Sequence, residues 1–340
     1  MDEGVNPLLE QVLHLLPQEI STKIELLPVK AKQQLEEIRI RENRPLEIII
    51  GQDHFFMNKN GELQQFTDYA YKPTSACCRR FLERITNYSL YSMEEQLKRG
   101  FITVTGGHRI GLAGRTILEN GEVKGLRDIT GFNIRIAREI KGTALPLMRK
   151  IINMHEQHVD STLIIAPPQF GKTTLIRDIA RCMSYGFYQP ESDYAVYEPL
   201  PIRSKKVAIV DERSEIAACY KGVPTFDVGP RTDVMDACPK AEGMMMMIRS
   251  MSPEVIVVDE IGRAEDVRAI QEASHAGIKV IASIHGYHLE DVYKRQDLHS
   301  LFSDETFRYV IELKRDSEGF MHRVINVKQW LKQKQSVVHQ

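Results

Sequence analysis

Apolar residues follow two different patterns in the two halves of the chain. In the second half, short and almost continuously apolar runs recur at residues 162–166, 207–210, 255–258 and 280–284. Runs of this kind are typical of parallel strands that are buried on both faces. Stretches with helical spacing, such as 264–276, separate the runs, so the pattern predicts an α/β domain with a parallel sheet over residues 161–335.

The first half alternates short segments of strand-like and helix-like pattern. Helical spacing occurs within residues 6–35 and again over 75–87. Strand patterns occur at 37–40, 46–50, 101–104, 110–114 and 132–136. This mixture predicts a smaller α+β domain over residues 1–145. The segment from Lys141 to Pro146 breaks the pattern and predicts a hinge, after which we expect a linker helix within residues 146–160.

Composition limits the functions that need to be considered. The chain has 340 residues, of which 42% are hydrophobic and 27% are charged, and its net charge is −1. This length suits about two domains, and the balanced charge gives no overall attraction to nucleic acid or to an anionic membrane. No apolar run approaches the ~18 residues of a membrane span, and the start lacks the features of a signal peptide. The five cysteines include no Cys-x-x-Cys pair, so we expect a cytoplasmic protein with neither disulfides nor a zinc site.

The segment after the first apolar run carries the clearest candidate chemistry, a phosphate-binding loop between a strand and a helix. Its residues are Ala166, Pro167, Pro168, Gln169, Phe170, Gly171, Lys172, Thr173 and Thr174. Backbone N–H groups at the start of such a helix bind phosphate, Lys172 would contact the β- and γ-phosphates, and Thr173 would bind Mg²⁺. The strict pattern begins with glycine where this chain has Ala166, and Phe170 is bulky for such a loop, but Gly171 is retained.

Three further strands end in side chains that would face the same ligand. Ligands bind beyond the carboxyl ends of the strands in parallel sheets. One strand ends at Asp259, which can hold Mg²⁺, and at Glu260, which can orient and deprotonate a water. A second strand ends in another acidic pair, Asp211 and Glu212. The last ends at His285, which could report the state of a nucleotide through a hydrogen bond.

Residues 96–150 are basic in a chain that is otherwise balanced. They contain eleven lysine and arginine residues and four acidic residues, a difference of +7. Three explanations are open: a solvated positive surface, arginines that reach the nucleotide of a neighbouring subunit, or a groove for nucleic acid.

Longer motifs resemble those of known ATPases. Residues 251–263 and 277–286 resemble the Walker B strand and the His box of the type II/IV secretion and pilus-retraction ATPases, and 210–216 resemble their Asp box. Within that superfamily, a further set of segments is similar to the stage III sporulation AA family, the ATPases of the channel between mother cell and forespore in endospore-forming bacteria. These segments are 91–97, 106–115, 133–139 and 167–174. The resemblance extends from about residue 35 to residue 290.

The resemblance implies a RecA-like P-loop NTPase core behind the smaller domain, with ATP and Mg²⁺ as ligands and ATP hydrolysis as the activity. By position, it makes Lys172 and Thr173 the phosphate and Mg²⁺ ligands, Glu260 the catalytic base, Glu212 a second acid and His285 the His-box residue. It implies a ring, a hexamer by analogy, with ATP at the subunit boundaries. Candidates for arginines that act on a neighbour's nucleotide are Arg127, Arg135 and Arg138.

The same resemblance implies a cytoplasmic, mother-cell protein that lies at the membrane and docks on membrane proteins of the channel, where it drives assembly or transport. An ATP-dependent nucleic-acid-binding protein is the alternative, which the +7 segment favours and the lack of interleaved aromatic residues opposes. A nucleotide-dependent scaffold without turnover is opposed by Glu260. We therefore do not expect nucleic acid to be the main partner.

Overall fold

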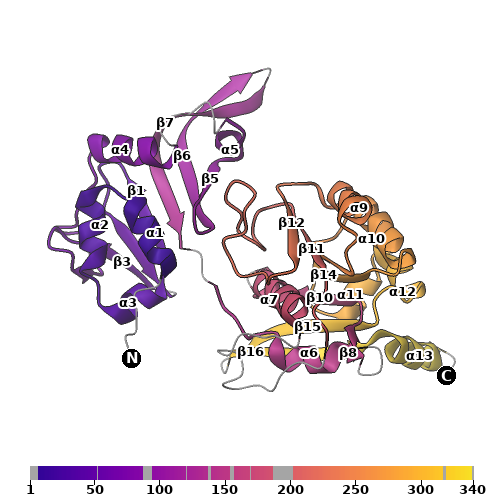
Figure 1. The fold of residues 1–340 in the computed structure, drawn as a ribbon. Helices are drawn as coiled ribbons and strands as arrows, with labels where there is room; N and C mark the ends of the chain where they lie inside the picture. Colours follow the sequence, from indigo (N-terminus) through magenta and orange to yellow (C-terminus); the bar gives the residue numbers. More distant parts are fainter. Residues whose placement is uncertain are drawn as a thin grey trace. The chain divides into compact units, whose positions relative to one another are not determined.

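The computed structural model describes residues 7–51, 53–86, 94–119, 121–136, 139–153, 157–168, 170–186, 202–316 and 319–338. Contacts between Cα atoms divide the chain into two compact units, residues 1–138 and 139–340 (Figure 1). The first unit is the α+β domain and the second the α/β domain that the apolar patterns predict. Within the described residues, no helix is both long and apolar enough to cross a membrane.

The N-terminal unit is built on one antiparallel sheet in the order β4-β3-β2-β1-β7-β6-β5. Its strands are β1 (Leu35–Arg41), β2 (Glu47–Ile50), β3 (Asp53–Met57), β4 (Leu63–Gln64), β5 (Phe101–Val104), β6 (His108–Glu119) and β7 (Glu122–Arg135). The hairpin of β6 and β7 is much longer than the sequence pattern predicts. Its outer part is exposed on both faces, so its residues show no alternation of apolar and polar positions.

Helices cover one face of this sheet. They are α1 (Pro7–Leu15), α2 (Gln18–Glu25), α3 (Val29–Gln34), α4 (Ser75–Ile85) and α5 (Glu94–Arg99). Residues 6–35 form three helices because Pro17 and Pro28, which lack an N–H, stand directly before α2 and α3. Side chains such as Leu9 and Phe81 pack with the inward residues of the sheet in one core. The alternate residues of the strands, many of them charged, lie on the opposite face.

The C-terminal unit is built on a second sheet in the order β12-β11-β13-β14-β10-β15-β16. Its strands are β10 (Thr162–Ala166), β11 (Val207–Asp211), β12 (Thr232–Asp236), β13 (Val255–Val258), β14 (Lys279–His285), β15 (Tyr309–Asp316) and β16 (Gly319–Asn326). All neighbouring strands are parallel except β16, which pairs antiparallel with β15. The predicted parallel sheet is therefore confirmed, and the carboxyl ends of β10, β11, β13 and β14 meet at one edge.

Two layers of helices cover this sheet. The helices are α6 (Leu145–Ile151), α7 (Lys172–Tyr185), α9 (Lys240–Met251), α10 (Ala264–His275), α11 (Leu289–Tyr293), α12 (His299–Ser303) and α13 (Val327–Val338), with the 3-10 helix η3 (Gln296–Leu298). Alternate residues of β10 enter different cores: Ile164 packs with α6 and α7, and Leu163 packs with the layer that contains α9 and α10. Burial on both faces explains why the strands are continuously apolar.

The segment predicted as a hinge is held by hydrogen bonds to the C-terminal unit. Lys141 donates to a carboxylate oxygen of Asp227 (2.9 Å), and the backbone N–H of Ala144 donates to Asp178 (2.7 Å). The segment therefore packs within the C-terminal unit, and the hinge stays a prediction. The following helix, α6, is also shorter than expected, because a small antiparallel pair of strands, β8 (Ile152–Asn153) and β9 (His158–Val159), begins directly after it.

Candidate functional site

The loop between β10 and α7 has the geometry of a phosphate-binding loop. Gly171 stands directly before α7 with φ of +78°, a conformation that glycine adopts without strain. Lys172 is almost buried, and its Nζ donates to the carbonyl oxygens of Ala166 (3.1 Å) and Pro167 (2.8 Å). Burial lowers the pKa of Lys172, while Asp259 and Glu260 act in the opposite direction. A bound phosphate would replace the carbonyl oxygens as the acceptor for this ammonium group.

The unusual residues of the loop have packing explanations. Ala166 is fully buried at the end of β10, and Phe170 packs against the core that α6 and α7 share. Both residues differ from the usual pattern of such loops, and both add apolar contacts to that core. Pro167 is buried, Pro168 is exposed and Thr174 lies in the first turn of α7, whereas Gln169 lies outside the described residues.

The order of strands brings the predicted acids and histidine to this loop. Because β14 lies between β10 and β13, His285 stands between the phosphate loop and the acidic residues that follow β13. The hydroxyl of Thr173 donates to Oδ2 of Asp259 over 2.7 Å. Two residues separated by 86 positions in the sequence therefore meet at the place where the sequence predicts Mg²⁺.

Lys172, His285 and Glu260 form a continuous chain of hydrogen bonds. Lys172 Nζ lies 3.1 Å from His285 Nδ1, and His285 Nε2 lies 2.8 Å from Glu260 Oε1. An ammonium group can only donate, so Nδ1 is the acceptor and the ring proton is on Nε2, from which it is donated to Glu260. The imidazole thus connects the candidate phosphate-binding lysine to the candidate base.

Two residues of this network escaped the sequence analysis. Ser283 donates to Asp259 and accepts the backbone N–H of Glu260 (3.0 Å), and so orients both acids. The sequence did contain a sign of this role, because Ser283 is a polar residue within the apolar run that forms β14. Arg213 forms an ion pair with Glu260. Its position after a second acidic strand gave no indication of this contact, which depends on the fold.

Glu260 itself has a strained backbone. Its φ is +52°, which is uncommon for a residue with a side chain. Such conformations cost on the order of 1–3 kcal/mol and cluster at functional sites. The conformation accompanies the two contacts of the carboxylate with His285 and Arg213.

The second acidic pair divides into two different roles. Glu212 forms an ion pair with Lys240 at the start of α9, and among the described residues no hydrogen bond joins it to Lys172, His285 or Glu260. Asp211 does not face the site: its carboxylate accepts the backbone N–H groups of Glu215, Ile216 and Ala217, each over 2.9 Å. Asp211 therefore holds the loop that carries Arg213 rather than completing a pair of catalytic acids.

Asp211 should make the stability of the protein depend on pH. Burial raises its pKa from 3.8 to about 6, although backbone N–H groups lower it. Between these values the folded protein keeps a proton that the unfolded chain has lost, so the free energy of unfolding falls as the pH rises. Asp211→Asn removes this titration. We expect the free energy of unfolding of the wild type, minus that of the variant, to fall by about 3 kcal/mol between pH of about 4 and pH above 6.

Urea unfolding at a series of pH values measures this difference. Asp233→Asn, which changes an exposed carboxylate on the neighbouring strand β12, is the matched control and should leave the pH dependence unchanged. If wild type and Asp211→Asn kept a constant difference over this range, the carboxylate would have its ordinary pKa in the folded protein.

The site suits a nucleotide with Mg²⁺ better than a metal ion alone. In the part of the chain that the structure describes, no three His, Cys, Asp or Glu side chains are grouped to hold a metal. Mg²⁺ is commonly held by one or two protein ligands together with phosphate oxygens and water. Thr173 and Asp259 fit that requirement, and the start of α7 with Lys172 would supply the phosphate contacts.

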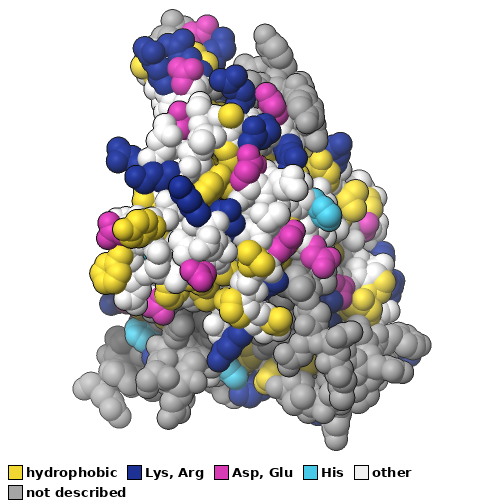
Figure 2. Space-filling view, turned by 90° about the vertical axis from the view of Figure 1, so that its left-hand side faces the viewer, with side chains coloured by type: hydrophobic (Ala, Val, Ile, Leu, Met, Phe, Trp, Pro, Cys, Tyr) yellow, Lys and Arg dark blue, Asp and Glu magenta, His cyan; other side chains and the backbone are white. Residues whose placement is uncertain are grey.

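The candidate trans-acting arginines belong to the N-terminal unit. Arg135 pairs with Glu37 at 3.5 Å and Arg127 lies 4.0 Å from Asp128, and the side chains of both arginines are more than half exposed. Arg138 lies outside the described residues. Lys and Arg side chains gather at the top of Figure 2, where Figure 1 draws the β6–β7 hairpin, which carries Lys124 and Arg127.

The sheet and the site define the class of protein, a RecA-like core of the kind found in secretion ATPases. The fold is similar to that of the ATPase DotB from Legionella pneumophila, with a TM-score of 0.55, 15% identity, and coverage of 92% of this chain and 81% of DotB. It is also similar to the pilus retraction motor PilT with bound ADP, with a TM-score of 0.57, 14% identity, and coverage of 91% and 87%. At these identities the likeness concerns the fold.

The model of the family described as "Sporulation stage III, protein AA" matches residues 8–329, and the chain belongs to this family. It is 46% identical over 307 residues to the stage III sporulation protein AA of Bacillus subtilis (strain 168). The aligned residues cover 90% of this chain and 91% of that protein. The resemblance drawn from the sequence motifs is therefore confirmed, and so is the expected fold.

Proposed function

We propose that this protein binds and hydrolyses ATP with Mg²⁺ at the carboxyl edge of its parallel sheet. The observation that carries the proposal is the hydrogen-bonded chain of Lys172, His285 and Glu260, beside the contact of Thr173 with Asp259. These residues come from three strand ends, and together they supply a phosphate contact, a metal position and a base. The chain also belongs to a sporulation family and has the fold of secretion ATPases.

In this proposal each side chain has one task. Lys172 would move from the carbonyl oxygens to the β- and γ-phosphates, and Thr173 and Asp259 would hold Mg²⁺, which would supply positive charge against the phosphates. Glu260 orients the attacking water and accepts its proton. His285 loses its contact with Lys172 when the lysine moves, and so transmits phosphate binding to Glu260. Glu212 is the second acid of the site.

We further propose that a neighbouring subunit completes the site in a ring, hexameric by analogy with related ATPases. The ring would dock on membrane proteins of the channel between mother cell and forespore. The ring would lie at the cytoplasmic face of the membrane and drive assembly or transport. The exposed arginines of the N-terminal unit support this arrangement, because a guanidinium group near the γ-phosphate stabilises charge in the transition state. Arg127, Arg135 and Arg138 are the candidates.

A mixing experiment tests the trans arrangement. ATPase activity per subunit should rise with protein concentration as rings form. Single changes Arg127→Ala, Arg135→Ala and Arg138→Ala are each measured alone and mixed with Lys172→Ala. An arginine finger contributes roughly 10³–10⁵ to turnover in other systems, so the correct arginine variant should be nearly inactive alone. Mixing should restore activity, because each subunit supplies what the other lacks.

Arg79→Ala is the control, since Arg79 is an exposed arginine on α4 of the same unit. It should keep full activity. Activity that is independent of dilution, without restoration in any of the three mixtures, would show that the N-terminal arginines do not complete the site.

A further inference from the structure

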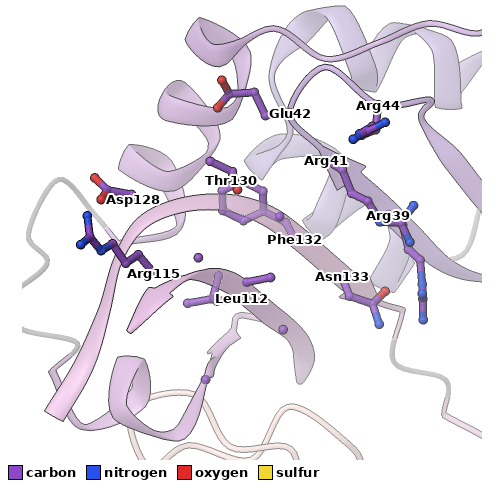
Figure 3. A pocket seen from close by; sticks show the side chains of 15 residues that line it. Arg39, Arg41, Glu42, Arg44, Leu112, Arg115, Asp128, Thr130, Phe132 and Asn133 are labelled. Carbon is purple, nitrogen blue, oxygen red and sulfur yellow. The ribbon is translucent and has the colours of Figure 1, made fainter. Parts of the chain in front are cut away.

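The polar face of the N-terminal sheet contains a groove that no part of the proposed ATPase mechanism uses. Its volume is about 780 Å³. Four arginines from three segments line it: Arg39 and Arg41 in β1, Arg44 in the following turn and Arg115 in β6. Figure 3 shows Arg39, Arg41 and Arg44 on one side of the groove and Arg115 with Asp128 on the other. Pockets of roughly 300–1,000 Å³ accommodate small organic ligands.

The arginines are of two kinds. Arg39 and Arg41 are oriented by carboxylates, Arg39 by Glu37 (2.9 Å) and Arg41 by Glu47 (2.7 Å). These ion pairs fix two guanidinium groups along one strand. Arg44 and Arg115 form no side-chain ion pair or hydrogen bond within the described residues. Two guanidinium groups of the groove are therefore available to a ligand, beside the carboxylates of Glu42 and Asp128.

The floor of the groove is mainly backbone, and it contains an unused acceptor. Gly111 and Gly131 lie opposite Asn133 and Arg41 in the pairing of strands, so two positions of the sheet face there carry no side chain. Asn133 lies between them, and its Oδ1 is buried without a hydrogen-bond partner among the described residues. A buried acceptor without a donor is unfavourable, so a ligand that donates to Asn133 would be favoured over one that does not.

We propose that this groove binds a nucleotide, either free or as part of a single strand, independently of the ATP site. The planar forks of the arginines match phosphate oxygens. The groove also has acceptors, Asn133 and the carboxylates of Glu42 and Asp128, which would repel a ligand made of phosphate alone. A nucleotide meets both requirements, because it carries phosphate together with ribose hydroxyl and base amino groups. Asparagine is a common partner of base edges.

The binding test uses the full-length Lys172→Ala protein, so that its result is independent of the ATP site. The probes are a short fluorescent single-stranded RNA, an unlabelled dinucleotide, inorganic tripolyphosphate and poly-glutamate. We expect the RNA or the dinucleotide to bind at least about tenfold more tightly than tripolyphosphate and poly-glutamate, since only nucleotides supply donors. Binding of RNA alone identifies a strand as the ligand, and equal binding of the dinucleotide identifies a free nucleotide.

Paired variants in the same background locate the binding. The double variant Arg44→Ala with Arg115→Ala should weaken nucleotide binding at least about tenfold. For RNA, the slope of log K against the logarithm of the salt concentration should become shallower by about one unit. Lys30→Ala with Arg79→Ala removes the same charge from exposed positions on α3 and α4 and should change neither. Asn133→Ala should weaken binding of the dinucleotide several-fold and leave binding of tripolyphosphate unchanged.

Three results would overturn the proposal. One is equal loss of binding in the two paired variants, which would mean that the groove contributes only general charge. Another is a preference for tripolyphosphate or poly-glutamate over nucleotides. The last is an Asn133→Ala protein that binds every probe as the parent does. None of these results would affect the proposed roles of Lys172, Glu260 and His285, which lie in the other unit.

Discussion

Lys172→Ala is expected to reduce ATP binding at least about 100-fold while the protein remains folded. Charge-assisted hydrogen bonds contribute about 1.5–3 kcal/mol each, and the lysine would make more than one to the β- and γ-phosphates. Its present acceptors are two backbone carbonyl oxygens and one imidazole nitrogen. No buried carboxylate is left without its partner in the variant, since Asp259 keeps its contacts with Thr173 and Ser283.

Titration of a fluorescent ATP analogue measures the affinity, and thermal unfolding shows whether the variant is folded. Lys328→Ala, a change of an exposed lysine in α13, is the matched control and should bind as the wild type does. Unchanged affinity in a folded Lys172→Ala protein would mean that the loop at the start of α7 does not bind phosphate.

Glu260→Gln is expected to retain ATP and Mg²⁺ but to hydrolyse ATP about 10²–10⁴-fold more slowly, which is the usual effect of losing a general base. Glutamine has the same shape, and its carbonyl oxygen can still accept from His285 Nε2. The geometry around Lys172 is thereby preserved, so the binding step should change little. What is lost is the capacity to accept a proton from water.

Single-turnover hydrolysis, together with a binding titration, separates the two steps. Glu265→Gln, on the exposed face of α10, controls for removal of a nearby negative charge. The assignment of the two acids would be reversed if Glu260→Gln turned over normally while Glu212→Gln did not. The ion pair of Glu212 with Lys240 makes that outcome unexpected.

Most of the C-terminal fold could be predicted from sequence because burial on both faces leaves a strong signal. The apolar runs at 162–166 and 255–258 coincide with β10 and β13. The position of the loop could also be predicted, because Gly171 and Lys172 are adjacent in the sequence and stand at the start of a helix. The same kind of reasoning failed where exposure removed the pattern, as in the outer part of the β6–β7 hairpin.

Contacts between distant residues were not predictable from the pattern of the chain. The link between Lys172 and His285 requires β14 to lie beside β10, and a list of strands does not give their order in the sheet. Asp211 illustrates a further limit, because its place at a strand end suggested chemistry and its carboxylate instead binds three backbone N–H groups. The groove of the N-terminal unit was likewise not predictable, because its arginines come from separate segments of the chain.

The central claim is that the edge formed by β10, β13 and β14 hydrolyses ATP. Phosphate release from ATP by the purified wild-type chain, measured over a range of protein concentrations with Mg²⁺ and with a chelator, tests it most directly. The account predicts turnover that requires Mg²⁺, rises per subunit with concentration, and is absent from a parallel preparation of Glu260→Gln. Release that is insensitive to chelation or identical in Glu260→Gln, or no release at any concentration, would contradict it.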